Sequence, residues 1–276
     1  MKKETVSVHP SAVITPGAEL DSGVAIGPYA VIGPQVRIGK NTWVGPHAVI
    51  EGHTTLGCEN RIFQFASVGA IPQDKKYRGE ESRLVIGNHN TIREFATLNP
   101  GTSGGGMVTR VGDYNLLMAY SHVAHDCLIG NQVVLANCAN LGGHVTLEDY
   151  VGVAALVGVH QFTRIGESAY IGAGSMVSLD VPPYCTANGD RAHLYGINLV
   201  GLKRRGFQSD QVAALKKAYR TLFGEGLPLK GALAQIRRDH PSSSEVAHLV
   251  EFVACSQRGI CRPRGRTNPE GEAELL

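Results

Sequence analysis

The sequence predicts a mainly β protein, in which a parallel β-helix is followed by an α-helical domain. Aliphatic residues recur every six positions through the first two thirds of the chain. The 34 glycines and the aromatic content of 6% suit many tight turns better than a large aromatic core. After residue 184 the pattern changes to helical spacing. A period of six fits neither the 3.6 residues of a helical turn nor the alternation of an amphipathic strand.

The six-residue repeat runs from Val8 to Val177. All 26 repeat positions outside two interruptions are Val, Ile or Leu, and glycine often follows the aliphatic, as in Ile26-Gly27. Such a hexad is typical of a very short strand followed by a corner, so three hexads close a triangular coil of 18 residues. Stacked coils pair as parallel strands about 4.8 Å apart, with one aliphatic side chain per side pointing into the prism.

Two interruptions break the repeat. Residues 69–85 keep its phase, which suggests that a loop replaces one whole coil, whereas the glycine-rich segment 99–110 adds an odd number of residues. Loops that project from a rigid scaffold often carry binding residues, although a tolerated insertion is the alternative. The first loop contains a polar cluster, namely Gln73, Asp74, Lys76 and Tyr77.

We expect the β-helix to occupy residues 1–189 and to end near Val181-Pro182-Pro183-Tyr184, because proline cannot extend a parallel ladder. Residues 190–260 should form the helical domain, with Ser209 as the N-cap of its first long helix. Helices are predicted at 209–223, 228–238 and 242–258. The polar segment 261–276 is expected to be a disordered tail.

Charge and cysteine content narrow the class of protein. The net charge of +2 gives no reason to expect a nucleic-acid partner, although basic residues gather late in the chain. The six cysteines form no CxxC pair, so we expect reduced thiols. Neither a signal peptide nor a run of about 18 apolar residues occurs, so no membrane span is expected. These features predict a cytoplasmic protein.

A column of polar residues on the coils is the candidate site. His125, Gly143 and Gln161 follow one another at intervals of 18 residues, so they should stack on three successive coils. Three further histidines flank the column: His122, His144 and His160. Histidine is the usual general base near neutral pH, and a glycine N–H can stabilise a tetrahedral oxyanion. This combination suits acyl transfer, with Asp126 orienting the His125 ring if the corner brings both side chains to one face.

Two other interpretations of the column remain open. The histidines can be unrelated surface residues, which is the commoner case for any one of them alone. They can also form a metal site, because neutral imidazole is a common metal ligand. The corresponding functions would be a catalytically silent scaffold that only binds a ligand, or a metal-dependent hydratase.

Seven motifs give a specific resemblance. They are VHPSA at 8–12, QDKKY at 73–77, NLLMAYSHVAHDC at 115–127, LGGH at 141–144, VHQF at 159–162, VPPY at 181–184 and GLKRRGF at 201–207. Together they resemble the bacterial UDP-N-acetylglucosamine O-acyltransferases over residues 8–259. This family implies a left-handed β-helix and a homotrimer with sites between neighbouring prisms. Its reaction moves a 3-hydroxyacyl chain from acyl carrier protein to the glucosamine 3-hydroxyl of UDP-N-acetylglucosamine, the first step of lipid A biosynthesis. No separate cofactor is implied, because phosphopantetheine arrives with the carrier protein.

The resemblance also assigns residues. It makes His125 the general base and Gly143 the oxyanion donor. The residues implied to hold the sugar, the pyrophosphate and the acyl chain are Asp74, His122, His144, His160 and Gln161, with Gln73, Lys76 and Tyr77 from the loop. Asn198, Arg204 and Arg205 are implied to reach the nucleotide. Paired guanidinium groups suit a pyrophosphate, although a solvated helix end is the alternative for this basic run. The basic helical region is expected to help dock the acidic carrier protein.

Three positions need separate comment. Val200 stands where the family often has a glutamate near the nucleoside, and Asn99-Pro100 replaces a common His-Arg pair. Ala173 occupies the position that limits acyl-chain length in the family. Because alanine is small, we expect a fairly long acyl chain.

Overall fold

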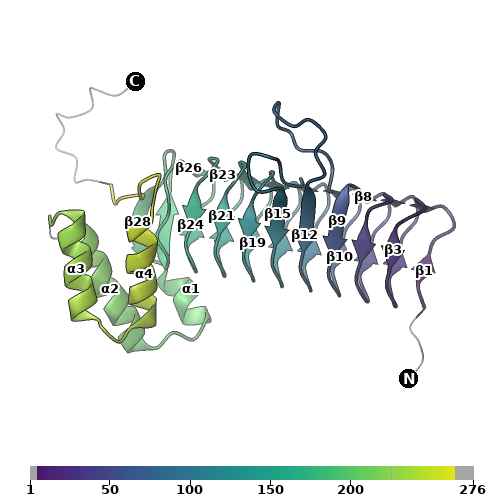
Figure 1. Cartoon of the computed structure of the whole chain (residues 1–276). Coiled ribbons are helices and arrows are strands. Elements are labelled where there is room, and N and C mark those ends of the chain that lie inside the picture. The colour runs from purple at the N-terminus through teal and green to yellow at the C-terminus, as the bar shows by residue number, and fades with distance from the viewer. Residues whose placement is uncertain (1–4, 225, 265–276) are drawn as a thin grey trace.

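The hexad repeat forms a three-sided prism of short parallel strands, with helices at its C-terminal end (Figure 1). The computed structural model describes residues 5–224 and 226–264. Successive strands belong in turn to sheets A, B and C, so each coil contributes one strand to every face. The turns between the faces are called here the A–B, B–C and C–A corners.

Most strands contain only two residues, as a six-residue repeat requires. Sheet A contains β1 (Ser7–Val8), β4 (Ala25–Ile26), β7 (Trp43–Val44), β10 (Arg61–Ile62), β13 (Thr91–Ile92), β16 (Leu116–Leu117), β19 (Val134–Leu135), β22 (Gly152–Val153), β25 (Tyr170–Ile171), β27 (Cys185–Asn188) and β28 (His193–Ile197). Sheet B contains β2 (Val13–Ile14), β5 (Val31–Ile32), β8 (Val49–Ile50), β11 (Ser67–Val68), β14 (Thr97–Leu98), β17 (His122–Val123), β20 (Asn140–Leu141), β23 (Gly158–Val159) and β26 (Met176–Val177). Sheet C contains β3 (Glu19–Leu20), β6 (Arg37–Ile38), β9 (His53–Leu56), β12 (Arg83–Ile86), β15 (Val108–Val111), β18 (Leu128–Ile129), β21 (Thr146–Leu147) and β24 (Arg164–Ile165).

The interior of the prism is filled by the aliphatic of each hexad. From Ile26 to Val177 every repeat position is buried. Val8 is exposed and Ile14 and Leu20 are half-buried, because they lie in the first coil at the open end of the stack. The 18-residue register is visible in the strand pairing, for example Val123 with Leu141 and Leu141 with Val159.

Both insertions leave the prism at the B–C corner, where they project as neighbouring loops (Figure 1). Ile86 pairs with Leu56, 30 positions earlier instead of 18, so twelve residues are inserted between two intact coils. The prediction that the first loop replaces a whole coil was therefore wrong, because a loop of twelve residues also preserves the phase of a hexad repeat. Val111 pairs with Ile86 at 25 positions, so the second insertion adds seven residues, an odd number as expected.

The prolines do not end the parallel ladder. Val181 still bridges Ile165, and β27 adds a further parallel strand beside β25. Pro182 and Pro183 are buried in the turn between these two pairings, where no ladder N–H is required. The antiparallel strand β28 then leads to the helices.

In the part of the chain that the structure describes, four helices follow β28: α1 (Leu199–Arg204), α2 (Ser209–Phe223), α3 (Leu229–Asp239) and α4 (Ser244–Ala254). The N-cap of α2 is Gln208, whose side chain forms a reciprocal capping box with Gln211, so the prediction of Ser209 as N-cap was wrong by one residue. The apolar faces of α2, α3 and α4 share a second core of buried aliphatics. Within the described residues, no helix is long and apolar enough to cross a bilayer.

The predicted tail begins as ordered structure. Cys261 is buried, its amide donates to the Asp180 carbonyl at 2.8 Å, and Pro263 bridges Leu194. The prediction of disorder was therefore wrong for residues 261–264, since they pack along the last coil. Residues 265–276 lie outside the described part of the chain.

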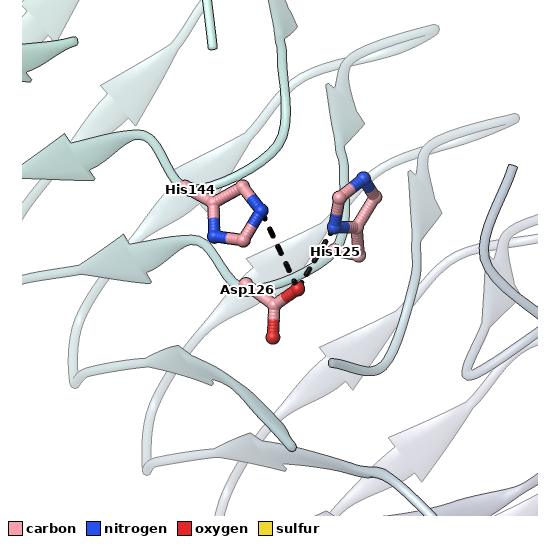
Figure 2. A group of neighbouring side chains, drawn as sticks. All are labelled: His125, Asp126 and His144. Atoms are coloured by element: carbon pink, nitrogen blue, oxygen red, sulfur yellow. Dashed lines mark hydrogen bonds and ion pairs between the residues drawn. The ribbon is translucent and has the colours of Figure 1, made fainter. Parts of the chain in front are cut away.

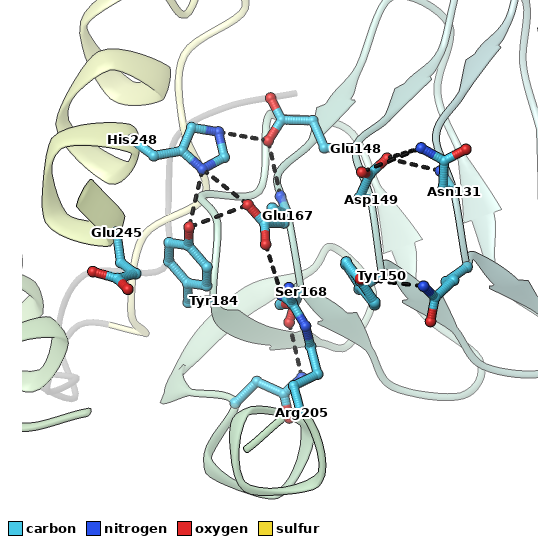
Figure 3. A network of polar contacts seen from close by, with 12 residues as sticks. Asn131, Glu148, Asp149, Tyr150, Glu167, Ser168, Tyr184, Arg205, Glu245 and His248 are labelled. Atoms are coloured by element: carbon cyan, nitrogen blue, oxygen red, sulfur yellow. Dashed lines mark hydrogen bonds and ion pairs between the residues drawn. The ribbon is translucent and has the colours of Figure 1, made fainter. Parts of the chain in front are cut away.

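A network of ionised side chains fastens α4 to the last coils (Figure 3). His248 of α4 lies 2.9 Å from Glu148 and 3.4 Å from Glu167, and its ring also contacts the Tyr184 hydroxyl at 3.1 Å. Arg205 lies 2.7 Å from Glu167. The two glutamates raise the pKa of His248 to about 9, so the ring is a cation at neutral pH.

Candidate active site

The His125–Asp126 pair lies at the B–C corner (Figure 2). Asp126 has a φ of 59°, in the left-handed region. This conformation turns the chain, so two consecutive side chains meet instead of pointing to opposite faces. His125 Nδ1 lies 2.8 Å from Asp126 Oδ2. Because an ionised carboxylate can only accept, Nδ1 carries the proton and Nε2 keeps a free lone pair.

Asp126 is buried and held by residues of the second insertion. Its Oδ1 accepts the Thr102 N–H at 2.9 Å, and its Oδ2 accepts the Thr102 hydroxyl at 2.7 Å. Its own N–H donates to the Thr109 hydroxyl at 2.7 Å. The carboxylate is therefore fully hydrogen-bonded in an enclosed position, as a buried charge requires.

Gly143 lies directly against the His125 ring. A Cβ atom at this position would lie 2.7 Å from His125 Nε2 and 2.5 Å from Cε1, so only glycine leaves room for the imidazole. Among the described residues no protein acceptor takes the Gly143 N–H. This amide is therefore available to a ligand beside the free Nε2 of His125.

His144 and His122 complete a cluster of imidazoles around His125. The His144 ring stacks on Phe162 at 4.2 Å between centroids and meets the His125 ring edge-on at 5.1 Å. Burial lowers the pKa of His144, and burial with the neighbouring His125 lowers the pKa of His122. Both rings are therefore biased towards the neutral form, which can donate and accept hydrogen bonds. His122 Nδ1 contacts the Thr97 hydroxyl at 2.7 Å.

A cavity of about 790 Å³ runs from this cluster along sheet B towards the helical end. Five of the residues predicted from sequence line it: Gln73, His122, His125, Gly143 and His160. Gln161 is exposed beside His160. Asp74 and Lys76 both influence the pKa of His144, so the first loop reaches the cluster. Tyr77 instead donates to the Glu80 carbonyl within its own loop.

The remaining predicted residues lie elsewhere in this chain. Ala173 is exposed at the A–B corner. Asn198 caps α1 and also donates to the Ser168 carbonyl at the C–A corner. Arg205 contacts Glu167 and stacks over Tyr150 at 3.5 Å, whereas Arg204 is exposed. One chain therefore presents the predicted residues at different corners of the prism.

Several lining residues were missed at the sequence level. Asn140, Gly158 and Met176 continue the column that begins at the predicted His122, facing outward from sheet B at intervals of 18 residues. The same register that aligned His125 with Gly143 could have identified them. Thr102 carried no signal, because an insertion loop lies outside the repeat. Ser178, Arg191 and Arg258 also line the far end of the cavity.

The His125, Asp126 and His144 side chains are the one group of potential metal ligands found among the described residues near the cavity, with ligand atoms within 4.8 Å of one another. Their hydrogen bonds do not suit a metal ion. Asp126 Oδ2 already accepts from His125 Nδ1 and Thr102 Oγ1, and a protonated Nδ1 cannot ligate. This donor set fits an oriented base better than a metal centre.

Comparison with known proteins places this geometry in a family. A model of domain 2 of UDP N-acetylglucosamine O-acyltransferase matches residues 180–261, and a bacterial transferase hexapeptide model matches residues 109–143. The acyl-[acyl-carrier-protein]–UDP-N-acetylglucosamine O-acyltransferase of Myxococcus xanthus is 55% identical over 255 residues, covering 92% of this chain and 99% of that protein. The chain belongs to this O-acyltransferase family.

Other members agree in sequence and fold. The O-acyltransferase of Janthinobacterium sp. is 52% identical over 92% of this chain and 99% of its own. The solved UDP-N-acetylglucosamine acyltransferase of Francisella novicida has a TM-score of 0.91 at 38% identity, covering 98% of this chain and 100% of that one. The fold predicted for this O-acyltransferase, a left-handed parallel β-helix followed by helices, is thereby confirmed.

Proposed function

We propose that this protein transfers a 3-hydroxyacyl chain from acyl carrier protein to the glucosamine 3-hydroxyl of UDP-N-acetylglucosamine, the first step of lipid A biosynthesis. Relatives at about half identity carry the names of acyltransferases for these two substrates. The observation that carries the proposal is the His125–Asp126 pair, whose free Nε2 lies beside the Gly143 amide in a substrate-sized cavity.

The proposed reaction begins with proton removal. His125 Nε2 takes the proton of the sugar 3-hydroxyl as its oxygen attacks the thioester carbonyl carbon. Asp126 accepts a hydrogen bond from Nδ1–H and thereby stabilises the imidazolium that forms. The carbonyl oxygen becomes an oxyanion, to which the Gly143 N–H donates. The C–S bond then breaks, and the imidazolium returns the proton to the departing phosphopantetheine thiolate. These steps need no metal or further cofactor.

The neighbouring imidazoles are proposed to position the sugar and its pyrophosphate. His122, His144 and His160 surround His125, and the loop residues Gln73 and Asp74 approach from the first insertion. The cavity along sheet B would take the acyl chain. Gly158 supports this assignment, because a Cβ there would meet the Met176 sulfur at 2.9 Å, so the glycine keeps the groove open.

We further propose a homotrimer with each site shared between two chains. The nucleotide residues Asn198, Arg204 and Arg205 lie towards the C–A corner, whereas His125 lies at the B–C corner. A neighbouring prism can bring the two corners together around one ligand. An exposed aromatic stack along the A–B corner offers a contact surface: Tyr29, His47, Phe65, Phe95 and Tyr120, with successive rings 4.8 to 5.1 Å apart. Exposed apolar columns of this kind commonly mark protein interfaces.

The acidic carrier protein is proposed to dock on the basic helical end. Lys203 and Arg204 are exposed in the last turn of α1, at the end of the prism towards which the cavity runs. Complementary charge would speed the encounter and orient the carrier. Both substrates and the reaction suit a cytoplasmic location, which we also propose.

The proposal is tested by incubating purified protein with UDP-N-acetylglucosamine and a series of 3-hydroxyacyl carrier proteins of different chain lengths. Mass spectrometry should detect a 3-O-acylated sugar nucleotide, with a preference for longer chains if Ala173 sets the limit. Absence of the ester with every chain length would overturn the proposal. Stoichiometric zinc in active protein, with activity lost on chelation, would favour a metal-dependent enzyme instead.

A further inference from the structure

The second insertion folds over the buried side of the His125–Asp126 pair. Thr102 donates to both oxygens of the Asp126 carboxylate, through its N–H at 2.9 Å and its hydroxyl at 2.7 Å. Thr102 is itself buried. Gly105 of the same loop lies so close that a Cβ there would fall 2.0 Å from Asp126 Cγ. The loop therefore packs closely against the carboxylate that His125 also contacts.

The two insertions are fastened to one another next to this contact. The Ser103 N–H donates to Glu80 Oε1 at 2.9 Å, and Arg83 exchanges backbone hydrogen bonds with Gly101 and Met107. The hydrogen bonds from the Ser103 and Arg78 amides lower the pKa of Glu80 to about 2, so it is ionised at neutral pH. The segment that carries Thr102 is consequently held from both sides.

We infer that the 99–110 insertion is a positioning element for the catalytic pair and that Thr102 is its principal residue. This inference rests on the proposed role of His125 as general base. Three hydrogen bonds fix the Asp126 carboxylate: two from Thr102 and one from His125 Nδ1. Without the Thr102 hydroxyl the carboxylate can rotate about its Cβ–Cγ bond, and Oδ2 then leaves the Nδ1–H. The ring loses the tautomer and the orientation that present Nε2 to the sugar hydroxyl.

The first test is Thr102→Val, which replaces the hydroxyl by a methyl group of similar size and keeps the backbone N–H. A hydrogen bond to a charged group is lost, so kcat should fall roughly tenfold or more. The KM for UDP-N-acetylglucosamine should stay within about twofold, because Thr102 does not touch the cavity. Thr102→Ser, which restores the hydroxyl, should recover most of the wild-type kcat.

A matched control is Thr54→Val. Thr54 is also buried, in strand β9 of sheet C just after the B–C corner, but its hydroxyl donates to the Glu51 carbonyl at 2.6 Å and not to Asp126. Leu84 pairs with Thr54 on one side and with Thr109 on the other, so Thr54 lies in the same sheet as the threonine that binds the Asp126 amide. Its kcat should match that of the wild type. A loss equal to that of Thr102→Val would mean that any buried threonine is needed for the fold, and would overturn the inference.

Coupling to Asp126 is measured by a double-mutant cycle. Asp126→Asn keeps the size of the side chain and tolerates the left-handed backbone. If Thr102 acts through the carboxylate, adding Thr102→Val to Asp126→Asn should lower kcat no further. Multiplicative losses would overturn the inference, because Thr102 would then act by another route.

A second variant covers the case in which Thr102→Val does not fold. Gly105→Ala leaves both Thr102 hydrogen-bond donors in place but pushes on the carboxylate, so kcat should again fall while KM is retained. Unchanged kcat in Gly105→Ala would contradict the inference. Full activity of Thr102→Val alongside an inactive His125→Ala overturns only the role of the loop, whereas an active His125→Ala overturns the proposed function itself.

Discussion

At the scale of single residues, the site depends on how closely Gly143 approaches the His125 ring. The imidazole occupies the space that any Cβ at position 143 would need. Asp126 contributes the other half of the arrangement, because its left-handed φ brings its carboxylate under Nδ1. Base and oxyanion donor are thus adjacent because one residue lacks a side chain and another turns the corner.

Gly143→Ala should therefore lower kcat by about 100-fold, since a misplaced reacting group commonly costs this much. The backbone N–H remains and the φ of Gly143 is not in the left-handed region, so the loss would report displacement of the His125 ring. Steady-state kinetics measure the loss of kcat, and a thermal melt measures any loss of stability. Gly231→Ala in α3, where a Cβ meets no atom within 4 Å, is the control. Retention of full activity in Gly143→Ala would contradict the account.

At the scale of elements, α4 is joined to the prism by the network around His248 (Figure 3). His248→Gln should lower the free energy of unfolding by about 1–3 kcal/mol, because two half-buried carboxylates lose a cationic partner. Arg237→Gln is a fitting control, since Arg237 lies 3.9 Å from Glu251 in an exposed pair and should change stability by less than about 0.5 kcal/mol. Urea denaturation measures the free energy of unfolding of both variants. Equal effects of the two substitutions would refute a special role for His248.

The same network predicts how the free energy of unfolding depends on pH. The pKa of His248 is raised to about 9, so its stabilising effect is complete below the ordinary value of 6.5 and is lost as the pH rises through 9. His248 and Arg205 lower the pKa of Glu167 to about 2. The stabilising effect of ionised Glu167 is therefore complete above pH 4.5 and is lost as the pH falls towards 2. The stability difference between wild type and His248→Gln should thus be largest between about pH 4.5 and 6.5. A stability difference between the two proteins that grows above pH 9 would contradict this account, because neutral His248 should no longer stabilise the fold there.

The prism was predictable from sequence because every coil repeats the same physical requirement. A buried aliphatic at each sixth position fixes both the strands and the register, and the register alone aligned His125 with Gly143. The insertions obey no such repeat, so the first was interpreted as the replacement of a whole coil, and the contact of Thr102 with Asp126 carried no sequence signal. The capping of α2 by Gln208 was missed for a related reason, since serine is the commoner N-cap residue.

At the scale of the whole molecule, a shared site predicts complementation between inactive chains. His125→Ala and Arg204→Glu remove the base and a proposed nucleotide contact from different corners of the prism. If each site combines His125 of one chain with Arg204 of the next, any mixed trimer has one intact site, and so about one third of wild-type activity. Co-expressed chains with two affinity tags allow mixed trimers to be purified and assayed. Activity no higher than that of the parent variants would show that both residues serve the same chain's site.

The most direct test of the central claim is the rate of ester formation by His125→Ala with saturating UDP-N-acetylglucosamine and 3-hydroxyacyl carrier protein. Loss of the general base should lower kcat by about 10²–10⁴-fold. The variant should still bind UDP-N-acetylglucosamine, and His89→Ala, which removes a histidine stacked on Tyr114 at the C–A corner, should retain wild-type activity. A His125→Ala protein that forms the ester at a rate close to that of the wild type would contradict the account.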